Sequence, residues 1–284
     1  MSRTGRFAFG LMAPISGLYL VFLLAPISFF LAMSVLKYDA IELYKPVLTG
    51  ENFGRLILDP YYRAIILLTL KIAGLTTLFS LLLGYPLAFF LARTQSVWRG
   101  VLMFLVIAPL MTGVIVRTYG WIVLLGAEGT INSVLRGLGL IAKPLQMLNT
   151  EFAVVVALVH ILMPYMVFPL FSALAAQDPN LERAAGTLGA GKLTTFLEVT
   201  LPLSRPGILM GSVLVFTLSA GAVVTPALLG GKEVQMMGQS IYDLVLRTLN
   251  WPLASAMALI LIVLQFAIIV LYFRGGRQGA GRRA

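Results

Sequence analysis

The sequence predicts an all-α integral membrane protein with six membrane-spanning helices, both chain ends in the cytoplasm, and a cytoplasmic loop between the fourth and fifth spans. Three observations indicate this class. Of the 284 residues, 59% are hydrophobic and only 11% are charged, whereas about a quarter of an ordinary soluble domain is charged. Six long apolar blocks follow one another along the chain. Basic residues gather in the segments assigned to the cytoplasm.

The composition also excludes several kinds of protein. There is no cysteine, and His160 is the only histidine, so disulfides, thiolate metal sites, cysteine nucleophiles and a centre with several histidine ligands are excluded. The formal charge is +10, but the basic residues lie between apolar blocks and form no long run. We interpret them as determinants of membrane orientation and expect no nucleic-acid partner.

The six spans follow from length and hydrophobicity, because a helix needs about 20 apolar residues to cross the hydrocarbon core of a bilayer. The first block is too long for the apolar region of a cleaved signal peptide, so we expect an uncleaved first span. Two blocks each contain one cation, Lys71 and Arg117. The predicted spans, within a single transmembrane domain of residues 1–284, are 7–36, 64–92, 100–125, 152–177, 206–231 and 248–273.

The direction of the spans follows from the distribution of charge. The termini, the turn at 93–99 and the loop at 177–205 hold 11 of the 21 basic residues but only three of the 11 acidic residues. Lys and Arg collect on the cytoplasmic side of membrane proteins, so these segments are expected there. The two long outer connections, 37–63 and 126–151, contain turn residues and enough apolar residues for short surface helices. They suit either partner docking or packing on the spans.

The loop at 177–205 contains a near match to a nucleotide-binding motif. Residues 186–193, GTLGAGKL, differ from the phosphate-binding pattern G-x-x-x-x-G-K-[ST] in having Leu193 where a hydroxyl would hold Mg²⁺. The preceding residues read as a helix and not as a buried strand. We therefore predict a helix capped by Asn180, a glycine turn at Gly189 or Gly191, and a second helix at 192–199 that Pro202 ends.

A family resemblance rests on this same loop. The segment LERAAGTLGAGKLTTFLEVTLPLSRPGI, residues 181–208, resembles the E-A-A-x-x-x-G loop, followed by L-P, of ATP-binding-cassette importer permeases. One departure is that Arg183 stands where the family has a glutamate, with Glu182 one position earlier. The resemblance implies that the first short helix is a coupling helix that contacts a separate ATPase subunit. The coupling residues it implies are Leu181, Glu182, Arg183, Ala184, Ala185, Gly186, Leu188, Gly189 and Ala190.

The resemblance extends over most of the chain. The stretches LLLGYPLAFFLART, APLMTGVIVRTYGWIVLLG and HILMPYMVFPLFSAL are similar to the larger-loop permease of spermidine/putrescine importers. This implies a bacterial inner-membrane location, a second and different permease subunit, a pair of ATPase subunits that hold ATP and Mg²⁺, and an external substrate-binding protein. No cofactor is implied for this chain. Related importers carry amino-acid-like compounds, opines, phosphonates or thiamine, so these cargoes stay open.

Ionisable and aromatic residues in or near the spans are candidates for the substrate path, because such residues are costly in a membrane and ring faces attract ammonium groups. Each has a simpler alternative. Aromatic residues also anchor spans at the interface, His160 could bond to a neighbouring span, and Arg117 could pair with an acid or a carbonyl. No acid falls at the middle of a span. The candidates are Arg117, Tyr119, Trp121, His160, Tyr165, Glu233, Tyr242, Asp243 and Trp251.

Two other functions remain as remote alternatives. An integral-membrane enzyme would need a cluster of His, Asp, Glu or nucleophilic residues at a common depth, and no such pattern of catalytic or metal-binding residues is visible. A passive channel would need neither ATP nor a coupling loop. The sequence therefore favours a transport permease that is not itself an enzyme.

Overall fold

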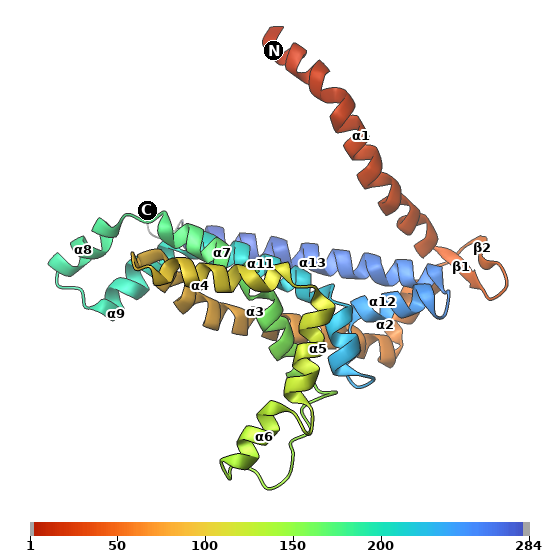
Figure 1. Cartoon of the computed structure of the whole chain (residues 1–284). Coiled ribbons are helices and arrows are strands. Elements are labelled where there is room, and N and C mark those ends of the chain that lie inside the picture. The colour runs from red at the N-terminus through yellow and green to blue at the C-terminus, as the bar shows by residue number, and fades with distance from the viewer. Residues whose placement is uncertain (1–2, 281–284) are drawn as a thin grey trace. The chain divides into compact units, whose positions relative to one another are not determined.

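The computed structural model describes the backbone of residues 3–280. Its regular secondary structure is helical apart from one hairpin (Figure 1). Three short segments are not α-helical: the 3₁₀-helix η1 (Ala108–Met111) and the π-helices η2 (Phe196–Thr200) and η3 (Pro226–Gly230). The strands are β1 (Leu36–Asp39) and β2 (Leu43–Leu48). The helices are α1 (Arg3–Ser34), α2 (Glu51–Leu58), α3 (Pro60–Arg93), α4 (Trp98–Ile107), α5 (Val114–Leu125), α6 (Thr130–Gly137), α7 (Glu151–Ala175), α8 (Pro179–Thr187), α9 (Lys192–Thr195), α10 (Leu201–Leu203), α11 (Arg205–Ala220), α12 (Met237–Leu246) and α13 (Trp251–Ala280).

The helical membrane class is confirmed. Among the described residues, five helical segments are long and apolar enough to cross a bilayer. A sixth is added if Lys192–Leu203 and Arg205–Ala220, which are bent by 63° against each other, count as one span. The five segments are Pro14–Ser34, Pro60–Arg93, Val114–Gly137, Glu151–Ala175 and Trp251–Tyr272.

Two of the predicted spans are not continuous helices. The block at 100–125 is divided into α4, the turn η1 and α5, because Pro109 offers no backbone donor and Gly113 precedes α5 in an extended conformation. The block at 206–231 is helical only to Ala220, where Gly221 ends α11, and the chain turns helical again at η3. Both predicted spans therefore contain a break in their helix.

The outer connection at 37–63 differs from the short helices that the sequence led us to expect. It contains α2, but it begins with an antiparallel pairing of β1 and β2, with Tyr38 opposite Tyr44. Asp39 stabilises the turn: it pairs with Lys45 and accepts bonds from the backbone amides of Ile41 and Glu42. These donors, Lys45 first, hold the pKa of Asp39 at about 2. In the second connection, α6 is the expected short helix.

The chain divides into two compact units. Unit 1 contains residues 1–63 and 240–262, and unit 2 contains 64–239 and 263–284. In unit 1, the side-chain amide of Asn52 donates to the carbonyl oxygens of Ser34 and Leu36, both at 2.9 Å. Asn250 caps the start of α13 by accepting from the Leu253 amide at 3.1 Å. These bonds tie α2 to the end of α1 and fix the start of α13.

Unit 2 is organised around α7, in which 13 of the 25 residues are buried. One hydrophobic cluster joins α7 to α3, α5 and the 229–236 segment, and a second joins it to the end of α3, to α4 and to α11. α11 packs closely on α7 through Gly207 and Gly211. A Cβ atom at Gly207 would lie 2.7 Å from the Pro169 carbonyl oxygen, and one at Gly211 would lie 2.7 Å from the Met166 sulfur. Small residues at this spacing let helix backbones approach.

Candidate functional site

The loop between α7 and α11 forms a helix, a glycine turn and a further helical segment, at one end of unit 2 (Figure 1). α8 begins at Pro179, and Asp178 caps it by accepting from the Asn180 amide at 2.9 Å. Asn180 therefore lies inside the helix, and the prediction that it forms the cap was wrong. Proline suits the first helical position because the amide there needs no partner within the helix.

The end of α8 is set by Gly189, which has φ +87°. The amide of Gly189 donates to the carbonyl of Gly186, and the amide of Ala190 donates to that of Ala185, both at 3.0 Å. Left-handed backbone favours glycine, so the prediction of a glycine stop at this position is confirmed. Gly191 has φ −69° and precedes α9 instead.

The second helix of the loop is longer and less regular than predicted. α9 continues through the π-turn η2 into α10, and Pro202 lies inside α10 without ending the helical path. Pro202 offers no backbone donor, and it follows directly on the π-turn, where the regular α-helical bonding is already interrupted. The break falls two residues later, where Ser204 separates α10 from α11.

α8 has no buried residue among its nine, and the much shorter α9 and α10 of the same loop have none either. Leu181, and Leu188 at the C-cap position just after the helix, are 46% and 88% exposed. A Cβ atom built at Gly186 would meet nothing within 4 Å. The small residues of α8 are therefore not required by packing within the described chain, and they leave the helix surface open to another protein.

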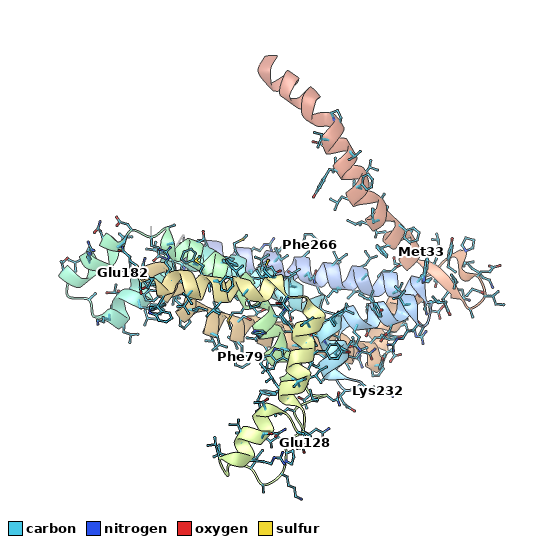
Figure 2. All side chains as sticks on the ribbon, in the orientation of Figure 1. Met33, Phe79, Glu128, Glu182, Lys232 and Phe266 are labelled. Carbon is cyan, nitrogen blue, oxygen red and sulfur yellow. The ribbon has the colours of Figure 1, made fainter. Side chains whose placement is uncertain are left out.

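One charged contact connects α8 to the membrane helices. Arg93, the last residue of α3, donates from Nη2 to Oε1 of Glu182 at 2.5 Å. Its other hydrogen bonds go to the Leu174 carbonyl at 3.2 Å, in the last turn of α7, and to the side-chain oxygen of Gln177 at 3.1 Å, just after that helix. Figure 2 shows Glu182 on α8, at the opposite end of unit 2 from Lys232. Charge-assisted bonds of this kind are stronger than neutral ones.

Glu182 is also connected to the π-turn η2. Its Oε1 also accepts from the Thr200 hydroxyl at 3.0 Å, and the Gln177 amide donates to the Thr200 carbonyl at 3.2 Å. α3, α8 and η2 thus meet at one carboxylate, and the end of α7 is linked to it through Arg93 and Thr200. The sequence predicts Glu182 as a coupling residue, whereas no sequence motif points to Arg93, Gln177 or Thr200 as its partners. In the sequence Arg93 stands out only as one of the basic residues that set orientation.

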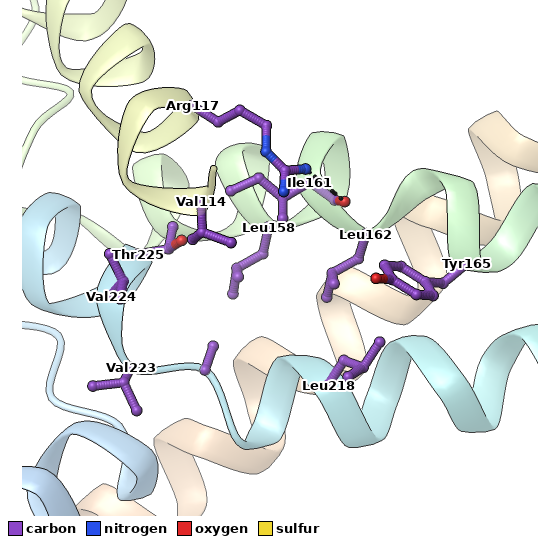
Figure 3. A pocket seen from close by; sticks show the side chains of 11 residues that line it. Val114, Arg117, Leu158, Ile161, Leu162, Tyr165, Leu218, Val223, Val224 and Thr225 are labelled. Atoms are coloured by element: carbon purple, nitrogen blue, oxygen red, sulfur yellow. Dashed lines mark hydrogen bonds between the residues drawn. The ribbon is translucent and has the colours of Figure 1, made fainter. Parts of the chain in front are cut away.

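The residues predicted to line the substrate path do not lie together: some line two different cavities and the others line neither. Arg117 on α5 and Tyr165 on α7 line a cavity of about 310 Å³ with otherwise mostly apolar walls (Figure 3). The Arg117 guanidinium donates to the Ile161 carbonyl at 3.4 Å, which fits the carbonyl alternative, and its Nε is buried without a partner among the described residues. The lining residues include no acid. This cavity is therefore cationic.

Trp121 and His160 form a second pair. The indole Nε1 donates to His160 Nδ1 at 3.3 Å, and the two rings meet edge to face with centroids 5.7 Å apart. Both line an apolar cavity of about 440 Å³. Trp121 lies on α5 and His160 on α7. His160 therefore bonds to a neighbouring helix, as the simpler alternative predicts.

The remaining candidates do not join either cavity. Tyr119 is exposed on α5, and Glu233 is exposed in the turn after η3. In unit 1, Tyr242 is exposed, Asp243 pairs with Arg247 one turn along α12 at 3.1 Å, and Trp251 begins α13. Among the residues that the structure describes, no group of three or more His, Cys, Asp or Glu side chains could hold a metal ion.

The fold and this loop define the class: a multi-pass membrane permease with an exposed helix held at one end of its helical unit. Comparison with known proteins agrees. Residues 84–274 match the family described as the binding-protein-dependent transport system inner membrane component, and the chain belongs to that family. It is a permease subunit of a binding-protein-dependent ATP-binding-cassette importer in the inner membrane. It is not the catalytic subunit, because the ATPase of such an importer is a separate chain.

Two relatives cover nearly the whole chain. The spermidine/putrescine transport system permease protein PotB of Haemophilus influenzae is 38% identical over 256 residues, which are 90% of this chain and 89% of the relative. PotB of Escherichia coli is 36% identical over 267 residues, 94% of this chain and 97% of the relative. Among solved structures, a bacterial alginate transporter with its periplasmic protein gives a TM-score of 0.79 at 17% identity, covering 97% of this chain and 96% of that one. The latter likeness concerns the fold alone.

Proposed function

We propose that this chain forms half of the translocation path of an importer for polyamines such as spermidine and putrescine. The relatives that carry this name match it at 38% and 36% identity over 90% and 94% of the chain. In the proposed complex a second, different permease subunit completes the path, and an external binding protein delivers the cargo. A pair of ATPase subunits holds ATP and Mg²⁺.

The observation that carries the coupling role is α8, a nine-residue helix with no buried residue at one end of unit 2. We infer that α8 docks on an ATPase subunit at the cytoplasmic side. Leu181, Ala184 and Leu188 offer exposed side chains, and Gly186 and Gly189 leave the backbone accessible. Arg183 is exposed on the same helix, so the partner meets a cation where the family usually has an acid.

In the proposed path, this chain contacts the cargo through aromatic ring faces and not through carboxylates. Ammonium groups are attracted by ring faces, and Tyr165 and Trp121 line the two cavities. Neither set of lining residues contains an acid, so the second permease subunit would supply the carboxylates. The exposed Glu233 would lie near the outer mouth.

The test is reconstitution of the full complex with its binding protein in liposomes. Spermidine or putrescine should stimulate ATP hydrolysis and should appear inside the liposomes, since coupled importers hydrolyse ATP faster when loaded binding protein docks. The same complex without binding protein serves as the control. ATP-independent flux would favour a passive channel instead.

One observation favours a second cargo class. The cavity beside Arg117 presents a guanidinium with no acid among its lining residues, and a guanidinium binds carboxylates well. An amino-acid-like compound, with both an amine and a carboxylate, would suit this cavity better than a polyamine. 4-Aminobutyrate is a suitable probe in the same assay. Stimulation by 4-aminobutyrate and not by putrescine would overturn the polyamine assignment.

A further inference from the structure

The Arg93–Glu182 pair is the strongest feature that the established family does not explain. α8 has no buried residue, so apolar packing contributes little to holding it in place. The segments around it are anchored differently. Phe196, at the start of η2, meets the rings of Tyr85 and Phe89 on α3 edge to face, with centroids 5.6 and 6.2 Å apart. The orientation of α8 therefore depends on its polar contacts.

Glu182 is the centre of these contacts. It accepts from Arg93 at 2.5 Å and from Thr200 at 3.0 Å, through the same oxygen. The side chains of Arg93 and Glu182 are 21% and 30% exposed, so solvent screens the pair less than it would a surface pair. The Arg93 guanidinium also lies over the Phe89 ring, 5.7 Å from its centroid.

The other end of the connection lies in the core of unit 2. Arg93 is the last residue of α3, and two residues before it Leu91 is fully buried in the cluster with α7. Six residues before Leu91, the Tyr85 hydroxyl bonds to the Ser204 hydroxyl at 2.9 Å, at the break between α10 and α11. A displacement of α8 that acts on Glu182 thus reaches α3 and, through Tyr85, the bend that begins α11.

We propose that Arg93 and Glu182 are positioning residues, and that their ion pair is the connection through which α8 moves α3. This inference rests on the proposed coupling role of α8. The pair does not contact ATP or cargo. It holds the helix at a fixed angle, so that ATPase closure displaces the membrane helices and not α8 alone.

The first test measures the position of α8 in the full chain by itself. The chain has no cysteine, and Leu188 is 88% exposed, so a Leu188→Cys background accepts a single spin label. Glu182→Gln and Arg93→Met should each increase the mobility of the label in lipid nanodiscs. Glu198→Gln, an exposed acid on η2, and Arg99→Gln, whose guanidinium stacks on Phe171, are the controls. An unchanged line shape in both test variants would overturn the proposal.

The second test uses the reconstituted complex and measures cargo taken up per ATP hydrolysed. Each single variant should lower this ratio about tenfold while the ATPase still co-purifies, and Arg93→Met/Glu182→Gln should be no worse than either single change, because partners in one interaction are not additive. Additive losses, or a looser α8 with unchanged uptake per ATP, would contradict the proposal. If wild type transports nothing, the proposed function fails, whereas the spin-label result still reports on the anchor.

Discussion

Gly186 and Gly189 lie three residues apart and have different physical roles. Gly189 has φ +87°, which L-residues adopt at a cost of roughly 1–2 kcal/mol. Gly186 lies inside α8, where a Cβ atom would meet nothing within 4 Å. The backbone of the chain thus requires glycine at 189, whereas at 186 only a contact with another protein would require it.

This difference gives a test of docking at the level of one residue. Gly186→Leu should leave the thermal stability of the chain unchanged or slightly raised, because glycine in a helix costs about 0.5–1 kcal/mol relative to alanine. The same change should abolish co-purification with the ATPase, since the leucine side chain would fill the space that the partner occupies. Gly186→Ala, with a single added methyl group, is the matched control. Normal ATPase binding by Gly186→Leu would exclude this face as the docking site.

At the level of elements, the packing of α11 on α7 depends on two glycines one turn apart. At Gly207 the obstacles to a side chain are the Pro169 carbonyl oxygen and the Ala173 Cβ atom, each 2.7 Å from the position that a Cβ atom would take. The oxygen belongs to the backbone and cannot move aside. At Gly211 the nearest atom is the flexible Met166 side chain, also at 2.7 Å.

We therefore expect Gly207→Ala to destabilise the chain by about 1–3 kcal/mol, the usual cost of overpacking. Gly211→Ala should cost less, because Met166 can adjust. Thermal unfolding in detergent, followed by tryptophan fluorescence, measures both. Gly74→Ala on α3, where a Cβ atom has nothing within 4 Å, is the control and should be neutral or stabilising. Equal stability of the Gly207 and Gly74 variants would refute the close approach of the two helices.

The elements were largely predictable because the bilayer imposes long apolar blocks. α3 and α7 follow theirs to within four residues, and α13 continues seven residues past the end of its block. The positions at which helices are interrupted were harder to predict. Pro109 and Gly113 are visible in the sequence, but proline and glycine also occur inside intact membrane helices, such as Pro164 in α7. The hairpin β1–β2 has no strong alternating pattern.

The candidate site was predictable only where it is local. Asp178-Pro179 and Gly189 are adjacent in sequence to the helix that they begin and end. The Arg93–Glu182 bond joins residues 89 positions apart, and no local pattern encodes such a pair. The sequence also cannot show which substrate-path candidates lie together, because they are far apart along the chain. The structure places Arg117 with Tyr165 in one cavity and Trp121 with His160 in another.

At the scale of the whole molecule, the charge distribution predicts which segments face the cytoplasm. Cysteine labelling suits the test because the chain has no native cysteine. Ile41 and Leu188 are 92% and 88% exposed, and they lie in segments assigned to opposite sides. Ile41→Cys should react with a membrane-impermeant maleimide in spheroplasts, and Leu188→Cys only in inside-out vesicles. The reverse pattern would invert the orientation and place α8 out of reach of an ATPase.

α1 has a consequence for how the protein is made. Pro14–Ser34 carries no charged side chain, and its most apolar 18-residue window has 0% of its residues buried. In a bilayer a helix satisfies its own backbone groups and is stable without neighbours. α1 can therefore leave the translocon and enter lipid while the remaining helices are still being synthesised. It would tether the nascent chain to the membrane until the later, interrupted spans find their partners.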